Sequence, residues 1–372
     1  MKKNQLVTLG KHIDILSGCA FPSSGFNRNN GVPLIRIRDI LSGKTETYYE
    51  GSYDLKYLIK KGDLLVGMDG DFNREYWKGT DALLNQRVCK ITPNPETLDK
   101  NFLYHFLQKE LDKIHATTDV VTVKHLSVKK IQDIKIRLPS LKEQKRIAAI
   151  LDKADAIRQK REQAIKLADD FLRAKFLEMF GTPANNIHRF PKGTIRDLVD
   201  SVNYGTSAKA SIDSGEYPIL RMGNITYQGR WDFTDLKYLD LSVKEKDKYL
   251  VKEGDLLFNR TNSKELVGKT AVYEEDRPMA FAGYLIRVRP NSIGNNYYIS
   301  GYLNSIHGKI TLMNMCKSIV GMANINAQEL QNIEILIPPK HLQDEYEIIY
   351  KKIKKGLSIY DKSAMQLQLL AS

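Results

Sequence analysis

The sequence predicts an α+β protein with two related globular domains, separated by two long helices that pair as an antiparallel coiled coil. Three observations lead to this prediction. Short β-type runs alternate with Gly, Asn and Asp, a set of segments occurs twice in the same order, and each copy ends in a long charged stretch. At 372 residues the chain also exceeds an ordinary single core.

The internal duplication rests on three pairs of similar segments, each pair in the same order along the chain. The pairs are 32–40 (VPLIRIRDI) with 217–225 (YPILRMGNI), 57–65 (YLIKKGDLL) with 249–257 (YLVKEGDLL), and 131–139 (IQDIKIRLP) with 330–338 (LQNIEILIP). Each copy also has a late helical patch, at 101–114 and at 297–310. Because chance matches would not stay in order over both halves, we expect the same fold twice.

A long helix is predicted after the first copy, because residues 141–179 contain neither glycine nor proline. Apolar side chains spaced by three and four fall on one helical face: Ile147, Ile150, Ala154, Ile157 and Phe171. Gly181 and Pro183 then supply a stop signal. Such a helix would span roughly 58 Å at 1.5 Å per residue, too long to bury its apolar face on one small domain.

The chain ends in a second stretch of this kind, with a stripe formed by Tyr346, Ile349, Ile353, Leu357, Tyr360 and Leu367. We expect the two helices to pair antiparallel, which would place the two domains at opposite ends of a rod with an approximate two-fold relation. The alternative is that each helix packs on its own domain. The expected boundaries are 1–139 for the first domain, 140–181 for the central helix, 182–338 for the second domain and 339–372 for the C-terminal helix.

The composition is basic, with 57 Lys and Arg against 44 Asp and Glu and a formal charge of +13. Such a balance favours a polyanionic partner, although a merely soluble basic protein remains the alternative. No apolar run approaches the roughly 20 residues of a membrane-spanning helix, and no signal-peptide core is present. Three well-separated cysteines do not form a CxxC motif. We therefore expect a cytoplasmic protein without a membrane partner.

Basic and amide side chains near the turns of each copy are candidates for contacts to double-stranded DNA. In the first copy these are Arg36, Arg38, Arg74, Lys78, Asn85, Gln86 and Arg87, and in the second Arg221, Asn224, Arg260, Thr261, Asn262, Lys269 and Lys317. Arginine pairs with guanine and Asn or Gln with adenine in the major groove, whereas Lys and Thr suit phosphates. For any one of these residues, a solvated surface charge or a turn cap is the competing interpretation.

Catalytic signatures are missing from the sequence. Ser263 stands where a P-loop preceding Gly268-Lys269-Thr270 would need its first glycine, and neither GxGxxG nor HExxH occurs. Asp69-Gly70-Asp71 pairs two carboxylates, yet this tripeptide more often forms a turn. A nuclease site at Asp69 and Asp71 is thus the least favoured hypothesis. We expect no enzyme activity, no bound metal and no cofactor in this chain.

Three features resemble the specificity (S) subunit of type I restriction-modification systems. They are the tandem of two domains each followed by a long helix, the boundary motif at 138–147 (LPSLKEQKRI) with a looser echo at 337–345, and the Lys-Gly-Asp-Leu-Leu element at 61–65. The resemblance covers almost the whole chain. In the second boundary, Asp344-Glu345 stands where the first has Glu143-Gln144.

The resemblance implies that each domain is a target recognition domain reading one half of an asymmetric, two-part DNA site. It also implies that the helices act as a ruler and a platform for two methyltransferase (modification) subunits, which bring S-adenosylmethionine. Two restriction (translocase-nuclease) subunits can join such complexes, while the specificity subunit is non-catalytic. The alternatives are the specificity subunit of a fused methylase-nuclease system and a coiled-coil scaffold protein that binds no DNA.

Overall fold

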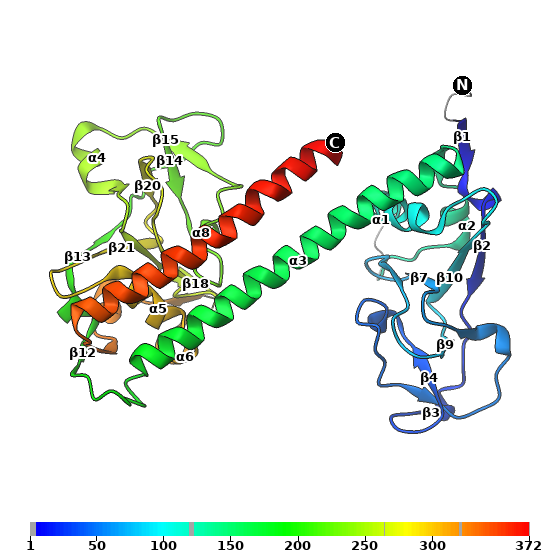
Figure 1. Ribbon diagram of the computed structural model, residues 1–372, viewed down its shortest axis with the longest axis horizontal. Coiled ribbons are helices and arrows are strands. Elements are labelled where there is room, and N and C mark those ends of the chain that lie inside the picture. Colours follow the sequence, from blue (N-terminus) through cyan, green and yellow to red (C-terminus); the bar gives the residue numbers. More distant parts are fainter. Residues whose placement is uncertain (1–4, 119–122, 264, 320–321, 372) are drawn as a thin grey trace. The chain divides into compact units, whose positions relative to one another are not determined.

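The computed structural model describes residues 5–118, 123–263, 265–319 and 322–371 of the chain (Figure 1). It divides into two compact units, Met1–Gln159 with Leu367–Ser372, and Lys160–Gln366. The helix predicted over 141–179 is α3 (Leu141–Phe180), and the C-terminal one is α8 (Lys340–Ala371). Each unit mixes helices with sheets, as an α+β fold does.

Unit 1 contains three sheets and two further helices. The strands pair in the orders β1-β11, β2-β10-β7-β8 and β3-β5-β4-β9-β6. Their bounds are β1 Gln5–Thr8, β2 Ile13–Ser17, β3 Phe26–Asn27, β4 Val32–Ile35, β5 Tyr48–Tyr49, β6 Leu58–Ile59, β7 Leu64–Gly67, β8 Arg74–Tyr76, β9 Ala82–Leu84, β10 Val88–Pro93 and β11 Lys135–Leu138, with helices α1 Lys100–Ala116 and α2 Val128–Gln132.

Unit 2 repeats this arrangement and adds a small sheet, β18-β23-β22. Its other sheets are β12-β24, β13-β21-β17-β19 and β15-β14-β20-β16. The bounds are β12 Lys192–Thr194, β13 Val199–Tyr204, β14 Tyr217–Leu220, β15 Lys237–Leu239, β16 Leu250–Val251, β17 Leu256–Asn259, β18 Thr261–Asn262, β19 Thr270–Val272, β20 Met279–Phe281, β21 Leu285–Pro290, β22 Lys317–Ile319, β23 Met322–Asn324 and β24 Glu334–Leu336, with helices α4 Val243–Tyr249, α5 Asn296–Asn304, α6 Ile306–Met315 and α7 Ala327–Gln331.

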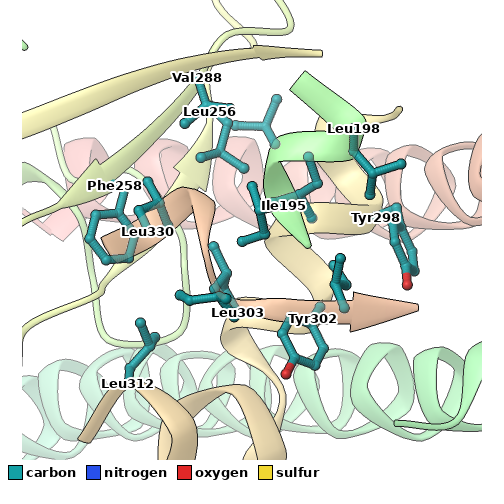
Figure 2. Packing of buried hydrophobic residues seen from close by; sticks show 14 of the residues in the cluster. Ile195, Leu198, Leu256, Phe258, Val288, Tyr298, Tyr302, Leu303, Leu312 and Leu330 are labelled. Carbon is teal, nitrogen blue, oxygen red and sulfur yellow. The ribbon is translucent and has the colours of Figure 1, made fainter. Parts of the chain in front are cut away.

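A central strand buried on both faces organises each unit. In β7, Leu64 and Val66 belong to the core under α1, while Leu65 belongs to a second core on the other face. Alternate side chains of a strand point to opposite faces, so one Leu-Leu-Val run serves both cores. In unit 2, β17 does the same: Leu256 and Phe258 face one core and Leu257 the other. Figure 2 shows the core of unit 2 that contains Leu256 and Phe258.

The late helical patches differ between the two copies. In unit 1, α1 is one helix whose Leu103, Leu107 and Leu111 are buried at a spacing of four. In unit 2, the patch predicted as one helix over 297–310 is broken into α5 and α6. Ser305 lies at the break, where its side-chain oxygen accepts a 3.0 Å hydrogen bond from Gly308 N and caps α6.

The same backbone hydrogen bonds recur at matching points of the two units. Met68 N donates to Arg87 O in unit 1, and its counterpart in unit 2 is the bond from Arg260 N to Tyr284 O. The bond from Leu126 N to Met68 O corresponds to that from Ile325 N to Arg260 O. The bond from Gln86 N to Cys19 O corresponds to that from Gly283 N to Thr206 O, and all six are 2.7–3.0 Å long. The hairpin after each central strand is closed by Gly67 N to Asn73 O and by Asn259 N to Lys269 O, both 2.8 Å. These closures enclose residues 68–72 in unit 1 and 260–268 in unit 2. The duplication expected from the sequence is therefore present in the fold.

A fully buried glutamine ties the start of each long helix to its own unit. Gln144 donates to Pro139 O at 2.9 Å and Thr97 O at 3.0 Å, and accepts from Asp99 N at 2.8 Å. Gln343 donates to Pro338 O at 2.8 Å and to Ile293 O at 2.9 Å. Gln343 is therefore the counterpart of Gln144, and the alignment of Asp344-Glu345 with Glu143-Gln144 is wrong. The two glutamines correspond because each donates to the backbone carbonyl oxygen of the proline five residues before it.

Within unit 2, α8 packs antiparallel along the C-terminal part of α3 (Figure 1). The rings of Phe176 and Phe180 lie 5.3 and 5.9 Å from that of Tyr346. Nearer the start of α3, Leu172 lines one cavity together with Tyr350, Ile353 and Leu357, which lie later on α8 than Tyr346. Residues with lower numbers on α3 therefore contact residues with higher numbers on α8, so the two helices run in opposite directions.

Not all of the residues expected to pair the helices do so. Phe171 is 48% exposed, and its neighbour Leu172 lies toward α8 instead, because adjacent helical residues differ by about 100° in direction. Ile150 and Ile157 are 47% and 37% exposed. Ile147, Ala154 and Ile349 are half-buried, whereas the side chains of Tyr360 and Leu367 lie outside the described residues.

We expect Gln144→Ala to lower the free energy of unfolding by about 1–3 kcal/mol, because it strips partners from three buried backbone groups. Urea denaturation followed by circular dichroism measures this change. Gln163→Ala, at an exposed position of the same helix, should change the free energy by less than about 0.5 kcal/mol. Equal losses in the two variants would show that the buried amide contributes nothing specific.

Candidate nucleic-acid interface

A basic groove of about 660 Å³ opens on unit 2. Arg221, Asn262 and Lys269, three of the residues proposed from the sequence, line it. The groove is also lined by Lys209, Lys237 and Tyr284, which the sequence argument did not select. Hydrogen-bond donors and positive charges around one concave surface suit a nucleic acid, whose phosphates attract cations and whose base edges accept hydrogen bonds.

Arg221 is held in place at the rim of the groove. Its Nη2 donates to the carbonyl oxygen of Asp235 at 2.9 Å and to the Asp235 carboxylate at 2.8 Å. The side chain remains 29% exposed. A guanidinium oriented in this way has less conformational entropy to lose on binding than a freely rotating one.

Three of the residues proposed in unit 2 make hydrogen bonds within the fold. Asn224 is 3% exposed; its Nδ2 donates to Asp232 O and Asp235 O, and its Oδ1 accepts from Arg221 N. The Lys269 ammonium donates to Met222 O at 2.8 Å, and burial lowers its pKa. Thr261 Oγ1 donates to Asn324 Oδ1 at 3.0 Å. These side chains already use polar atoms within the fold, and their contact to DNA stays a prediction.

Arg260 and Asn262 flank the loop between β20 and β21. The Arg260 guanidinium lies over the Tyr204 ring, 4.9 Å from its centroid, and Nη1 donates to Gly283 O at 3.5 Å. Asn262 is half-buried and its Oδ1 accepts from Ser263 N at 2.9 Å. The side chain of Lys317 lies outside the described residues.

In unit 1, the proposed residues fall into exposed and packed sets. Arg36, Arg38 and Gln86 are exposed. Arg74 is half-buried and its guanidinium carbon lies 3.5 Å from the centroid of the Tyr104 ring. Asn85 is only 6% exposed, and its Oδ1 atom accepts a hydrogen bond from Gln86 N at 2.9 Å.

Lys78 forms an ion pair with Glu75 at 3.4 Å and is exposed. The backbone N–H of Arg36 donates to Asp39 at 2.9 Å, matching the bond from Arg221 to Asn224 in unit 2. Arg36 and Arg221 thus occupy equivalent turns, one in each unit.

A cluster of three charged or titratable side chains lies beside Gln86, and the sequence argument did not place them together. The Asp69 carboxylate lies 2.6 Å from His125 Nδ1 and 3.3 Å from Arg87 Nε. Arg87 was a candidate for DNA contact beside Asn85 and Gln86, and Asp69 belongs to the Asp-Gly-Asp tripeptide, whereas His125 carried no signal in the sequence. Because both of its oxygens are engaged, Asp69 is a poor metal ligand, and no group of three potential metal-binding side chains occurs in the described part of the chain.

A second cavity on unit 2, of about 350 Å³, is lined by Arg173, Tyr227 and Lys309 among others. The Lys309 ammonium nitrogen is buried with no hydrogen-bond partner among the described residues, and it lies 4.8 Å from the centroid of the Tyr227 ring. Burial, with the nearby charges of Arg173 and Lys269, lowers the pKa of Lys309 to about 8. The charged form of Lys309 therefore lowers the stability of the folded state.

The Lys309 pKa predicts a pH dependence of stability. Between the folded pKa of about 8 and the ordinary value of 10.5, the unfolded chain binds more protons, so this group makes folding more favourable as pH rises. We expect the difference in free energy of unfolding between wild type and Lys309→Met to move in favour of wild type from about pH 7 to about pH 10. Lys244→Met, at an exposed position of α4, should follow the wild-type profile, and parallel curves for Lys309→Met would contradict the assignment.

No helix in the described residues is long and apolar enough to cross a membrane. A family model for the type I restriction modification DNA specificity domain matches residues 1–167 and 190–370. The chain is 31% identical over 374 residues to the type I restriction enzyme EcoBI specificity subunit of Escherichia coli, covering 92% of this chain and 77% of that relative. It is 24% identical over 350 residues to the EcoKI specificity subunit of Escherichia coli strain K12, covering 87% of this chain and 75% of the relative.

The fold is also similar to that of the S subunit of a type I restriction-modification system from M. genitalium. The crystal structure of that subunit superposes with a TM-score of 0.65 at 15% identity, covering 100% of this chain and 94% of the other. Together with two copies of one unit and a basic groove, the family match identifies the chain as a member of the type I restriction-modification DNA specificity family.

Proposed function

We propose that this chain is the sequence-specificity subunit of a type I restriction-modification enzyme and reads an asymmetric, two-part site in double-stranded DNA, one half per unit. The observation that carries the proposal is one backbone frame used twice with different side chains. At matching points unit 1 has Asn85, Gln86 and Arg87 where unit 2 has Ala282, Gly283 and Tyr284. Unlike side chains on like frames favour unlike half-sites.

The charge of the chain supports DNA as the partner. A formal charge of +13 attracts a polyanion at long range, and the basic groove of unit 2 provides Lys209, Arg221 and Lys237 on one surface. Lysines would contact phosphates, and the arginine and amide side chains would contact base edges.

Catalysis belongs to partner subunits in this proposal. Two methyltransferase subunits would dock along the paired helices, where Ile150, Ile157 and Phe171 leave apolar surface exposed on α3. They would supply S-adenosylmethionine and receive the target base flipped out of the duplex. Two restriction subunits can complete the enzyme. This chain would hold no cofactor, perform no chemistry itself, and act in the cytoplasm with its DNA.

A scaffold protein that binds no DNA is the competing function, and a gel shift separates the two. We expect the chain with its methyltransferase partner to retard a duplex containing the site, with an affinity that falls steeply as salt rises. No shift at low salt with an assembled complex would favour the scaffold.

Replacing Arg260 and Asn262 with alanine should relax or abolish the selection of one half-site and leave the other intact, because both residues flank the loop of one unit. Sequencing of modified bases in cells that express the variant with its methylase measures the selection at each position. Lys244→Ala removes a charge from α4 of the same unit and should leave the site unchanged. If binding to both halves falls equally without a change in preference, these residues contact phosphates.

The distance between the half-sites should follow the length of the paired helices. Four residues inserted in phase into both α3 and α8 add about 6 Å, so the spacer should grow by one or two base pairs of about 3.4 Å. Modified-base sequencing reads the spacer directly. A two-residue insertion in each helix rotates the register by about 200° and should abolish modification instead. An unchanged spacer in the four-residue variant would refute the ruler.

A further inference from the structure

The cluster of Asp69, Arg87 and His125 in unit 1 has an uncharged counterpart in unit 2. Asp69 and His125 face each other as an isolated antiparallel bridge. At the same point of the frame in unit 2, Thr261 and Asn324 are paired strand residues. The units therefore present chemically different groups at one equivalent place.

The third position is also equivalent in the two units. The carbonyl oxygen of Arg87 accepts from Met68 N at 2.8 Å, and that of Tyr284 accepts from Arg260 N at 3.0 Å. Tyr284 is 55% exposed and lines the basic groove of unit 2. The position that faces the groove in unit 2 is thus occupied by an arginine in unit 1.

We infer that Arg87 is a specificity-determining residue of the first domain and contacts a guanine, and that Asp69 positions it for this contact. The inference rests on the proposed function, because it names one base contact within it. Tyr284 cannot make a bidentate contact to guanine, so the second domain reads the matching place of its half-site differently.

The contacts of Arg87 suit this role. Asp69 engages the Nε atom at 3.3 Å, and within the described residues neither terminal nitrogen has a hydrogen-bond partner. The Arg87 side chain is 56% exposed, against 24% for Asp69. An ion pair at the base of the guanidinium restricts its rotation while the outer nitrogens remain available for the O6 and N7 atoms of guanine.

The backbone conformation at Arg87 also supports a role in binding. Its φ is +73°, in the left-handed region that a long side chain rarely adopts. The turn between β9 and β10 is held on both sides, because Gln86 N donates to Cys19 O and Met68 N donates to Arg87 O, each at 2.8 Å. A strained residue persists where its surroundings fix it, and such residues cluster at binding sites.

Two other roles would give different results from base contact. An ion pair that only braces the loop against His125 would affect stability, and loss of it would weaken every duplex alike. A phosphate contact would lower affinity for all sequences and reduce the salt dependence by about one ion. Contact to a base edge alone changes which base is preferred at one position.

The test uses the full chain with its partner methyltransferase subunits and a library of duplexes randomised across both half-sites. Arg87→Ala and Arg87→Lys should each lower the preference for guanine at one position of one half-site by roughly tenfold or more. The lysine variant keeps the charge and loses the fork, so it separates base contact from charge alone. The other half-site, identified by the Arg260 and Asn262 variant, should keep its preference.

Asp69→Asn should weaken the same base preference by a smaller factor, since the guanidinium stays but loses its anchor. Lys56→Ala is the matched control, because Lys56 is also 56% exposed and forms an ion pair with Asp54 at 3.0 Å in the same unit. It should leave every base preference unchanged. Circular dichroism checks that each variant is folded, and Arg87→Lys decides the matter if Arg87→Ala does not fold.

The outcomes separate the inference from the function on which it rests. If the wild-type complex selects no sequence at all, the proposed function fails. If the wild-type complex selects a two-part site but both Arg87 variants keep its base preferences, or lose affinity for every duplex equally, the function stands and the assignment of Arg87 is wrong.

Discussion

The architecture depends on a buried amide at the first turn of each long helix. Gln144 and Gln343 are completely buried and bond to backbone carbonyls of their own units. Gln144 is bonded through both its nitrogen and its oxygen, whereas the Oε1 atom of Gln343 has no hydrogen-bond partner among the described residues. Turning either amide away from its backbone partners would leave buried polar groups unpaired, which is costly. Each helix therefore leaves its unit in one direction only.

A second constraint lies in the central strands. Because β7 and β17 are buried on both faces, their side chains cannot vary without disturbing two cores. The turns at the ends of these sheets are more exposed and less constrained. Variation can therefore concentrate in loops such as the one between β9 and β10 that holds Arg87, or the one between β20 and β21 that holds Tyr284, while the sheets that position those loops stay the same.

The fold was largely predictable because its signals are periodic or repeated. The absence of Gly and Pro over 141–179 predicted α3 to within one residue at its C-terminal end, and the repeated segments predicted the duplicated sheets. The break at Ser305 was missed, because a cap inside an apolar stretch carries only a weak local signal. Phe171 was assigned to the wrong side, since the choice between neighbours depends on the small twist of a real helix pair.

The candidate contacts were less predictable. Residue type selected Asn224 and Lys269, but only the fold reveals that their polar atoms are already bonded. Arg87 and His125 come together with Asp69 from three separate loops, and nothing in the spacing of these residues announces that contact. Burial and long-range pairing decide such cases, and neither can be read from a local pattern.

The hairpin closures have a consequence for how such a protein can change. An identical 2.8 Å bond closes residues 68–72 in one unit and the longer run 260–268 in the other. Lengthening a loop costs only slowly growing entropy once its ends are pinned. Insertions at this place can thus accumulate at little expense to folding, and each one places a new set of side chains on an unchanged sheet.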